Sequence, residues 1–175
     1  MKKIINYRLF PLVMGITFTV MTSAQEASAD TKLSKENIAY ISPDEFSPAI
    51  PSTEIKKSVL KDFKRTYGNI QSARWFKTSN GYGVSFKQAG INSRVFYTRN
   101  GAVDARINYY FEDGLPSHVR SVIGANFYDY SISHVAEVHK GDVTAYVVKI
   151  QNSKYVKSVK VIDGEWELIE SLVKN

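Results

Sequence analysis

The chain has 175 residues, of which 43% are hydrophobic and 13% aromatic, as is typical of a globular protein. It contains no cysteine, which excludes a disulfide framework, thiol catalysis, zinc–thiolate sites and a lipid-modified N-terminal cysteine. The formal net charge is +6, but three positive charges fall within the first eight residues, and the remaining Lys and Arg residues alternate with acids. We therefore expect no basic stripe for nucleic acid.

Residues 1–24 have the layout of a secretory signal peptide. Three basic residues precede an apolar stretch from Leu9 to Val20, and a small polar run ends at Ala24. Cleavage is predicted after Ala24, with Ala27-Ser28-Ala29 as a second candidate site. An N-terminal membrane anchor is the alternative, but the apolar run is shorter than the ~20 residues that a spanning helix needs. We expect a periplasmic or secreted protein whose mature chain has no transmembrane segment.

Residues 25–52 are polar and end in a proline-containing stretch, which predicts an arm or linker. The next segment, 53–67, places Ile55, Val59, Phe63 and Tyr67 at steps of four, with charged residues on the opposite side. This spacing predicts an amphipathic helix, and Ser52 or Thr53 is a candidate for its N-cap.

After this helix the hydrophobic period changes from 3.6 to two. Asn80-Gly81 and Asn100-Gly101 stand between alternating segments, and Asn-Gly in this context is a strong hairpin signal. The pattern predicts an antiparallel meander of four strands, over residues 70–77, 82–88, 92–99 and 102–110.

The pattern then starts again. Pro116 opens a second predicted helix, and four further strands are expected over residues 130–139, 143–151, 154–162 and 165–172. Val59 and Val119 are related by the same 60-residue offset as Gly81 and Gly141, which indicates an internal duplication. We expect an α+β protein of two tandem repeats, 53–112 and 113–175, whose strands form one curved eight-stranded sheet or two sheets of four, with the helices on one face.

A sheet with helices on one face leaves its other face for solvent or a partner. Phe96 and Tyr146 lie opposite the stronger apolar alternations of their strands, so we expect both to be exposed on that free face. Trp75 and Phe76 are adjacent, so one of them must point away from the helix. These four residues are the candidate partner-binding residues, although strand-favouring aromatics in a partly covered sheet would have the same pattern.

No catalytic, cofactor-binding or metal-binding residue is predicted. His134 and His139 are five apart on one expected strand and point to opposite faces, and His118 begins the second helix. The carboxylate pairs lie in loops, and the Gly-x-Ser-x-Gly motif is absent from the sequence. We therefore expect a protein that is not an enzyme and that carries no cofactor.

The run Ser58 to Gly68, the strand with Trp75, the segment Tyr82 to Phe86 and Arg94-Val95-Phe96-Tyr97 resemble the exported PepSY-like, β-lactamase-inhibitor-like (BLIP-like) proteins of Bacteroidetes. Leu115 to Val119 and Asp163 to Trp166 look like a second copy of the same pattern. The resemblance covers residues 53–174. It implies a tandem α-β-β-β-β protein and a concave, aromatic-rich sheet face that holds another protein, but it identifies no contact residue.

Two classes of function remain. The first is a non-enzymatic exported binding module that holds a protein or peptide against the free sheet face or the hairpin loops at Asn80-Gly81 and Lys140-Gly141. The second is a structural envelope protein, or a carrier that holds a small apolar ligand between the sheet and the arm of residues 25–52. A hydrolase has the least support from the sequence.

Overall fold

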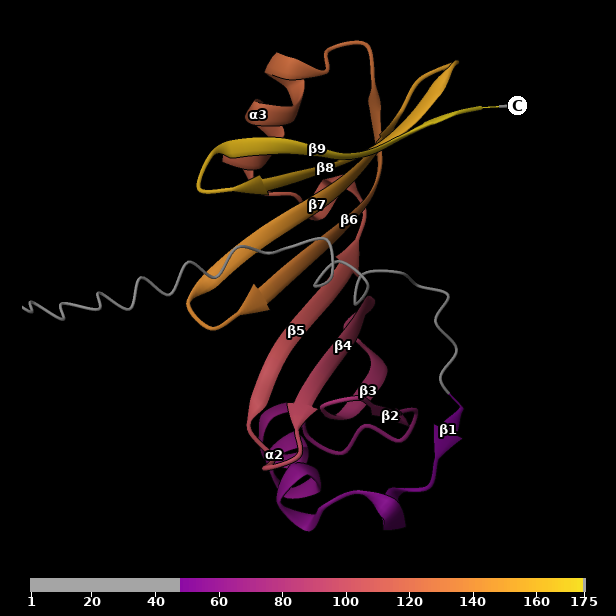
Figure 1. Ribbon diagram of the computed structural model, residues 1–175, viewed down its shortest axis with the longest axis vertical. Coiled ribbons are helices and arrows are strands. Elements are labelled where there is room, and N and C mark those ends of the chain that lie inside the picture. Colours follow the sequence, from indigo (N-terminus) through magenta and orange to yellow (C-terminus); the bar gives the residue numbers. More distant parts are fainter. Residues whose placement is uncertain (1–47, 175) are drawn as a thin grey trace, which may run out of the picture. The chain divides into compact units, whose positions relative to one another are not determined.

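The computed structural model describes residues 48–174, which form a single antiparallel sheet with two α-helices (Figure 1). Each of the nine strands pairs with the next along the chain, and β1 and β9 are the two edges, so the sheet is open. The strands are β1 Ala49–Ile50, β2 Arg74–Thr78, β3 Gly81–Gln88, β4 Ile91–Thr98, β5 Val103–Tyr110, β6 Ser131–Lys140, β7 Val143–Gln151, β8 Tyr155–Ile162 and β9 Glu165–Val173. The α-helices are α2 Lys57–Tyr67 and α3 Ser117–Asn126, each preceded by a 3-10 turn, η2 Ser52–Glu54 and η3 Glu112–Gly114.

The α+β class is confirmed, and a strand lies in each of the eight expected segments, but the sheet has nine strands instead of eight. The additional strand, β1, pairs with β2 and falls within the segment predicted to be an arm. A strand of two residues is too short to show a period-two pattern, and for this reason it could not be predicted. The predicted signal peptide and residues 25–47 of the predicted arm lie outside the described residues.

Tight turns set the order of the strands. In the β3–β4 turn, Ala89 and Gly90 both have positive φ (48° and 84°), and Asp163 and Gly164 repeat this arrangement (50° and 85°) between β8 and β9. Two consecutive left-handed residues make a type I′ turn, whose twist matches that of paired antiparallel strands. Hairpins are therefore favoured locally before any long-range contact forms.

Helix α2 covers one half of the sheet with the apolar side predicted for it. Val59 and Phe63 are buried against residues of β2, β3 and β4, and Gly68, with φ of 78°, ends the helix. The predicted start was wrong by four residues: Ile55 and Lys56 have ψ near 130°, so the regular helix begins at Lys57. Ile55 is nevertheless buried, because the 3-10 turn before it directs its side chain into the same cluster.

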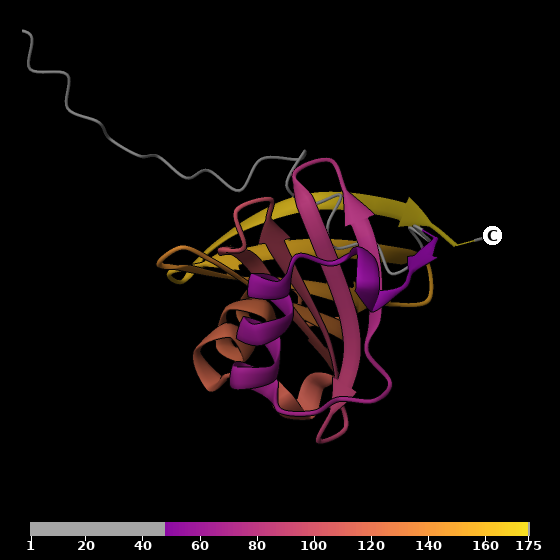
Figure 2. The ribbon, with the colours of Figure 1, turned by 90° about the horizontal axis from the view of Figure 1, so that it is seen from below.

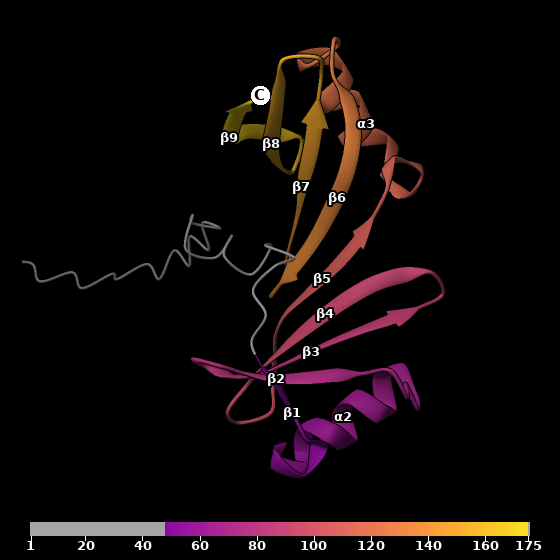
Figure 3. The same cartoon turned by 90° about the vertical axis from the view of Figure 1, so that its right-hand side faces the viewer.

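Helix α3 covers the other half of the sheet in the same way. Val119 and Ile123 are buried against β6, β7 and β8. Both helices lie on the same face of the sheet (Figures 2 and 3). No helix within residues 48–174 is long and apolar enough to span a membrane.

Candidate functional site

The strand register divides the side chains between two faces. Residues paired directly across antiparallel strands point to the same side, and alternate residues of one strand point to opposite sides. Val84 and Val95 are paired and lie in the cluster under α2, whereas the neighbouring pair Gly83 and Phe96 faces away from it. We call this second side the helix-distal face.

The helix-distal face carries an apolar cluster of its own. It runs continuously across the middle of the sheet, so it joins the half covered by α2 to the half covered by α3. Ile107 and Ala145, near its centre, have no exposed surface. The buried members come from β4 to β7 and are Phe96, Ala105, Ile107, Ala136, Val138, Ala145 and Val147, with Phe76, Tyr109, Ile162 and Ile169 packed around them.

Phe76 and Phe96 meet above a glycine. Gly83 is paired with Phe76 on one side and with Phe96 on the other, and the two rings lie edge to face with centroids 6.2 Å apart. A Cβ atom on residue 83 would be 2.2 Å from the Phe76 ring, so only glycine leaves room for it. An aromatic ring over a strand glycine is a known way of covering exposed backbone.

Arg94 and Tyr109 lie at the margin of this cluster. The Arg94 guanidinium is 5.7 Å from the centroid of the Tyr109 ring, a cation–π distance. Burial raises the pKa of Tyr109, and the nearby positive charge of Arg94 opposes this rise. The phenol therefore stays neutral and can donate a hydrogen bond.

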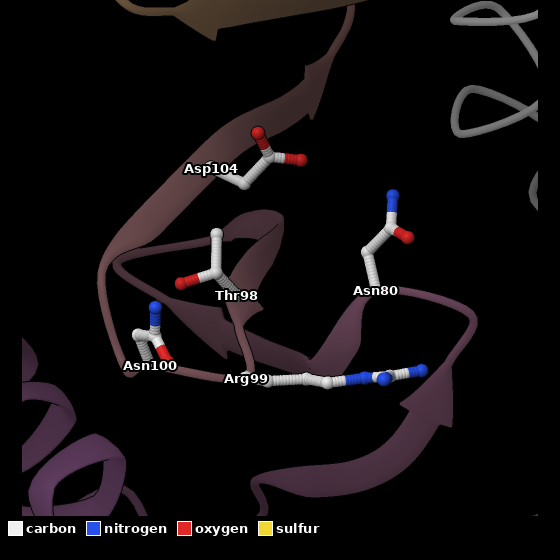
Figure 4. Close-up of a pocket in the computed structure, with 5 residues that line it drawn as sticks. All are labelled: Asn80, Thr98, Arg99, Asn100 and Asp104. Carbon is white, nitrogen blue, oxygen red and sulfur yellow. The ribbon is translucent and has the colours of Figure 1, made fainter.

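A polar pocket continues this face at the hairpin-loop end of β4 and β5. It has a volume of about 410 Å³ and is lined by Asn80, Thr98, Arg99, Asn100 and Asp104 (Figure 4). Thr98 is two residues from Phe96, so it belongs to the same face. The pairing of β4 with β5 shifts register between Phe96 and Tyr97, so β5 has one additional residue, Asp104, at this point.

The pocket is held in place by its own loops. The Arg99 guanidinium donates a hydrogen bond to the carbonyl oxygen of Ser79 at 2.9 Å, which ties the β4–β5 turn to the β2–β3 turn. The Asp104 carboxylate lies 3.9 Å from the Lys140 ammonium of β6. The pocket thus presents a guanidinium, a carboxylate and two amides, which together can pair with both donors and acceptors of a peptide.

Two of the four predicted aromatic residues are not where the sequence analysis placed them. Phe96 does face away from the helices, but it is buried, with 5% of its surface exposed. Tyr146 lies on the helix-covered face, where its ring centroid is 6.0 Å from that of His118 in α3. Strand β7 carries apolar residues on both sides, so the alternation in the sequence could not indicate which side faces the helix.

Trp75 and Phe76 divide between the two faces, as adjacent strand residues must. Trp75 packs under α2, with its ring 5.2 Å from that of Phe63. Phe76 lies on the helix-distal face beside Phe96. Of the four candidates, therefore, only Phe76 and Phe96 lie on the face proposed for a partner.

A polar cluster on the helix side was missed by the sequence analysis. The His139 Nδ1 is 3.1 Å from the Thr144 hydroxyl, and its Nε2 is 2.8 Å from Oε1 of Glu137. A hydroxyl, an imidazole and a carboxylate linked by hydrogen bonds can activate a nucleophile. Here the His139 Nε2 is buried and makes no aligned hydrogen bond, so the chain of hydrogen bonds does not continue to Glu137. Glu137 and His139 are alternate residues of β6, and the pairing of β6 with β7 brings Thr144 to His139.

The other histidines lie apart from this cluster. His118 is exposed at the start of α3, and His134 is exposed with its ring 5.1 Å from that of Phe111. Within residues 48–174, His, Asp and Glu side chains form no group of three that could hold a metal ion.

Several proteins of known structure are similar in fold to this chain. No protein-family model matches the chain, and no curated protein matches it. A Bacteroides eggerthii DSM 20697 protein, provisionally described as periplasmic, is 17% identical with a TM-score of 0.57, over 68% of this chain and 88% of that chain. A DUF2874 family protein from Bacteroides uniformis ATCC 8492 is 14% identical with the same TM-score, over 67% and 88%.

A BLIP-like protein from Bacteroides fragilis NCTC 9343 also has a TM-score of 0.57, at 15% identity, over 71% of this chain and 87% of that chain. These structures share the fold of this chain and agree with the BLIP-like resemblance found in the sequence. Their descriptions mention neither PepSY domains nor a duplication.

Proposed function

We propose that this chain is an exported, non-catalytic binding protein that holds a protein or peptide at the polar pocket and along the helix-distal face. The observation that carries the proposal is the position of the pocket. Its charged and amide groups stand at the end of an apolar face that runs across both halves of the sheet. Asn80, Arg99 and Asn100 are exposed, so the polar groups of the pocket are accessible to a partner, whereas the apolar residues beside them are buried.

Location outside the cytoplasm is part of the proposal. The predicted signal peptide supports export, and the B. eggerthii neighbour supports the periplasm as the destination. The BLIP-like description of the B. fragilis protein supports a protein as the partner.

We also propose that the chain arose by internal duplication. The turns η2 and η3 begin 60 residues apart, and each is followed by a helix and four strands. The buried residues Ile55, Val59 and Phe63 correspond at the same offset to Leu115, Val119 and Ile123, which are also buried. A shared offset of buried positions supports two copies of one ancestral module.

Charge reversal in the pocket tests the binding proposal. Arg99→Glu changes an exposed pocket residue, and Lys61→Glu makes the same change on the outer side of α2. Both variants and the parent chain are used to capture proteins from an envelope extract, after thermal unfolding has shown that all three are folded. A partner retained by the parent and by Lys61→Glu, and lost by Arg99→Glu, supports the pocket as the binding site; equal retention by both variants contradicts it.

A further inference from the structure

Within residues 48–174, strand β9 is an open edge of the sheet, since it pairs with β8 on one side alone (Figure 1). The opposite edge, β1, has only two residues and lies between Pro48 and Pro51. Shortness and flanking prolines both discourage the addition of another strand. β9 has nine residues and no proline, so it is the edge at which a further strand can be added.

Exposed apolar side chains gather on this edge strand. Trp166, Leu168, Leu172 and Val173 are 44%, 43%, 51% and 71% exposed. Large apolar side chains beside unpaired backbone groups are typical of a strand that pairs with another chain. The composition of β9 therefore indicates an interface along this edge.

One hydrogen bond fixes which backbone groups β9 presents to solvent. The Lys174 N–H donates to the carbonyl oxygen of Lys154 at 2.8 Å, so residue 174 is directed toward β8. This direction alternates along an antiparallel strand. The N–H and C=O groups of Val173 and Ser171 therefore point outward, away from β8.

The first half of β9 has outward groups on the same face as the second half. Trp166 and Leu168 are paired with valines of the cluster under α3. Ser171 is paired with Lys157, whose ammonium is 5.7 Å from the centroid of the Phe127 ring in that cluster. Side chains on one face of a strand go with one backbone direction, so Trp166 and Leu168 also point their N–H and C=O groups outward.

These four outward residues suit pairing with a second copy of β9. In an antiparallel pair about a two-fold axis at the middle of the strand, Trp166 lies opposite Val173 of the second copy, and Leu168 lies opposite Ser171. Both pairs join residues of the helix side, and both bring outward N–H and C=O groups together. The strand thus contains the complement of its own edge, as a two-fold interface requires.

The charges of the edge are complementary in the same register. The charged residues are Asp163, Glu165, Lys160 and Glu167 toward the turn, the last two as an ion pair, and Lys154 and Lys174 at the other end. Antiparallel pairing places the acidic end of each copy against the basic end of the other, with Glu165 opposite Lys174. Charge therefore favours an antiparallel second copy over a parallel one.

We propose that two copies of this chain join their β9 edges in an antiparallel pair about a two-fold axis, which makes one continuous sheet. The dimer is closed, because the short, proline-flanked β1 is the other edge of each copy. The axis runs across the sheet, so the helix-distal faces of both copies lie on one side. That this dimer presents two binding surfaces to a partner rests on the proposed function, whereas the dimer itself is measured without a partner.

Exchange of the charges at the ends of β9 tests the pairing and its register. Glu165→Lys places lysines opposite each other at both ends of the interface, and Lys174→Glu places glutamates there. Each variant alone should dimerise on the order of tenfold more weakly than the parent chain, because two cross-strand pairs change from attraction to repulsion. An equimolar mixture of the two variants restores opposite charges in both pairs and should dimerise as the parent does, which sedimentation equilibrium measures.

Two further variants complete the test. Lys64→Glu, on the exposed side of α2, is the matched control and should leave the dissociation constant unchanged. The axis passes between Ile169 and Glu170, so Glu170 stands beside its own copy, and Glu170→Gln should tighten the dimer several-fold by removing this repulsion. A parent chain that is monomeric at millimolar concentration, or a dimer that the mixture fails to restore, would overturn the proposal. Partner capture with Arg99→Glu tests the pocket whichever result is obtained.

Discussion

The ring of Phe76 lies directly over Gly83, at a point where a Cβ atom would be 2.2 Å from it. The contact places Phe76 against Phe96 and so forms the β2 end of the helix-distal cluster. Glycine is required at position 83 because the Phe76 ring lies so close to the backbone. The turn glycines of the hairpins are required for a different reason, their backbone conformation.

Gly83→Ala should therefore destabilise the fold, because the added methyl group forces the Phe76 ring out of its position. Overpacking of this kind costs about 1–3 kcal/mol. Gly124→Ala is the matched control, since a methyl group added to Gly124 in α3 would meet no atom within 4 Å, and alanine favours the helix by about 1 kcal/mol. In urea unfolding, the free energy of unfolding should fall for Gly83→Ala and rise for Gly124→Ala. An unchanged free energy of unfolding for Gly83→Ala would contradict the packing described.

Phe63 should be among the most sensitive positions of the first half. Its ring is 5.2 Å from that of Trp75 and 5.1 Å from that of Phe86, and the residue is 5% exposed. Phe63→Ala should cost about 3–5 kcal/mol, because it removes buried area and leaves a cavity. Lys64→Ala, on the exposed side of the same helix, should change the unfolding free energy by less than about 0.5 kcal/mol. Equal effects of the two variants in chemical unfolding would contradict the position of α2.

Stability should fall at alkaline pH in part because of Tyr110. Burial, and then the nearby Glu137 carboxylate, raise the pKa of Tyr110 above its ordinary value of 10.0. The folded protein therefore keeps this proton at pH values at which the unfolded chain has lost it. The contribution of Tyr110 to the free energy of unfolding is complete below pH 10 and is lost as the pH rises above it. Tyr110→Phe should lose less stability than the parent between about pH 9 and pH 11.

Tyr128→Phe is the control for this pH series, because Tyr128 is 89% exposed. Its unfolding free energy should follow that of the parent chain at each pH. A Tyr110→Phe series parallel to both would show that this phenol titrates alike in the folded and unfolded chain.

The β8–β9 turn offers a test of backbone conformation alone. Asp163 and Gly164 both have positive φ, a region in which a β-branched residue is strained. Asp163→Val should cost about 1–2 kcal/mol, whereas Asp163→Asn should be tolerated because asparagine readily adopts this conformation. Thermal unfolding of the two variants measures the difference, and equal melting temperatures would contradict the type I′ assignment.

Local residue patterns were sufficient to predict most of the helices, strands and turns. Steps of four placed Val59 and Phe63 on the buried side of α2, and the turn residues Asn80-Gly81 and Asn100-Gly101 marked hairpins between neighbouring strands. These signals are readable because a helix stripe and a two-residue turn depend on residues close together in the chain.

Tertiary structure alone decided which face each strand side chain occupies and what lies beside it. The side that Tyr146 occupies could not be read from β7, which is apolar on both faces, and Thr144 meets His139 only through the pairing of β6 with β7. The Phe76–Gly83–Phe96 contact likewise depends on the register of three strands. Period-two alternation sorts a strand into two sets, but only packing against the helices decides which set is turned toward them.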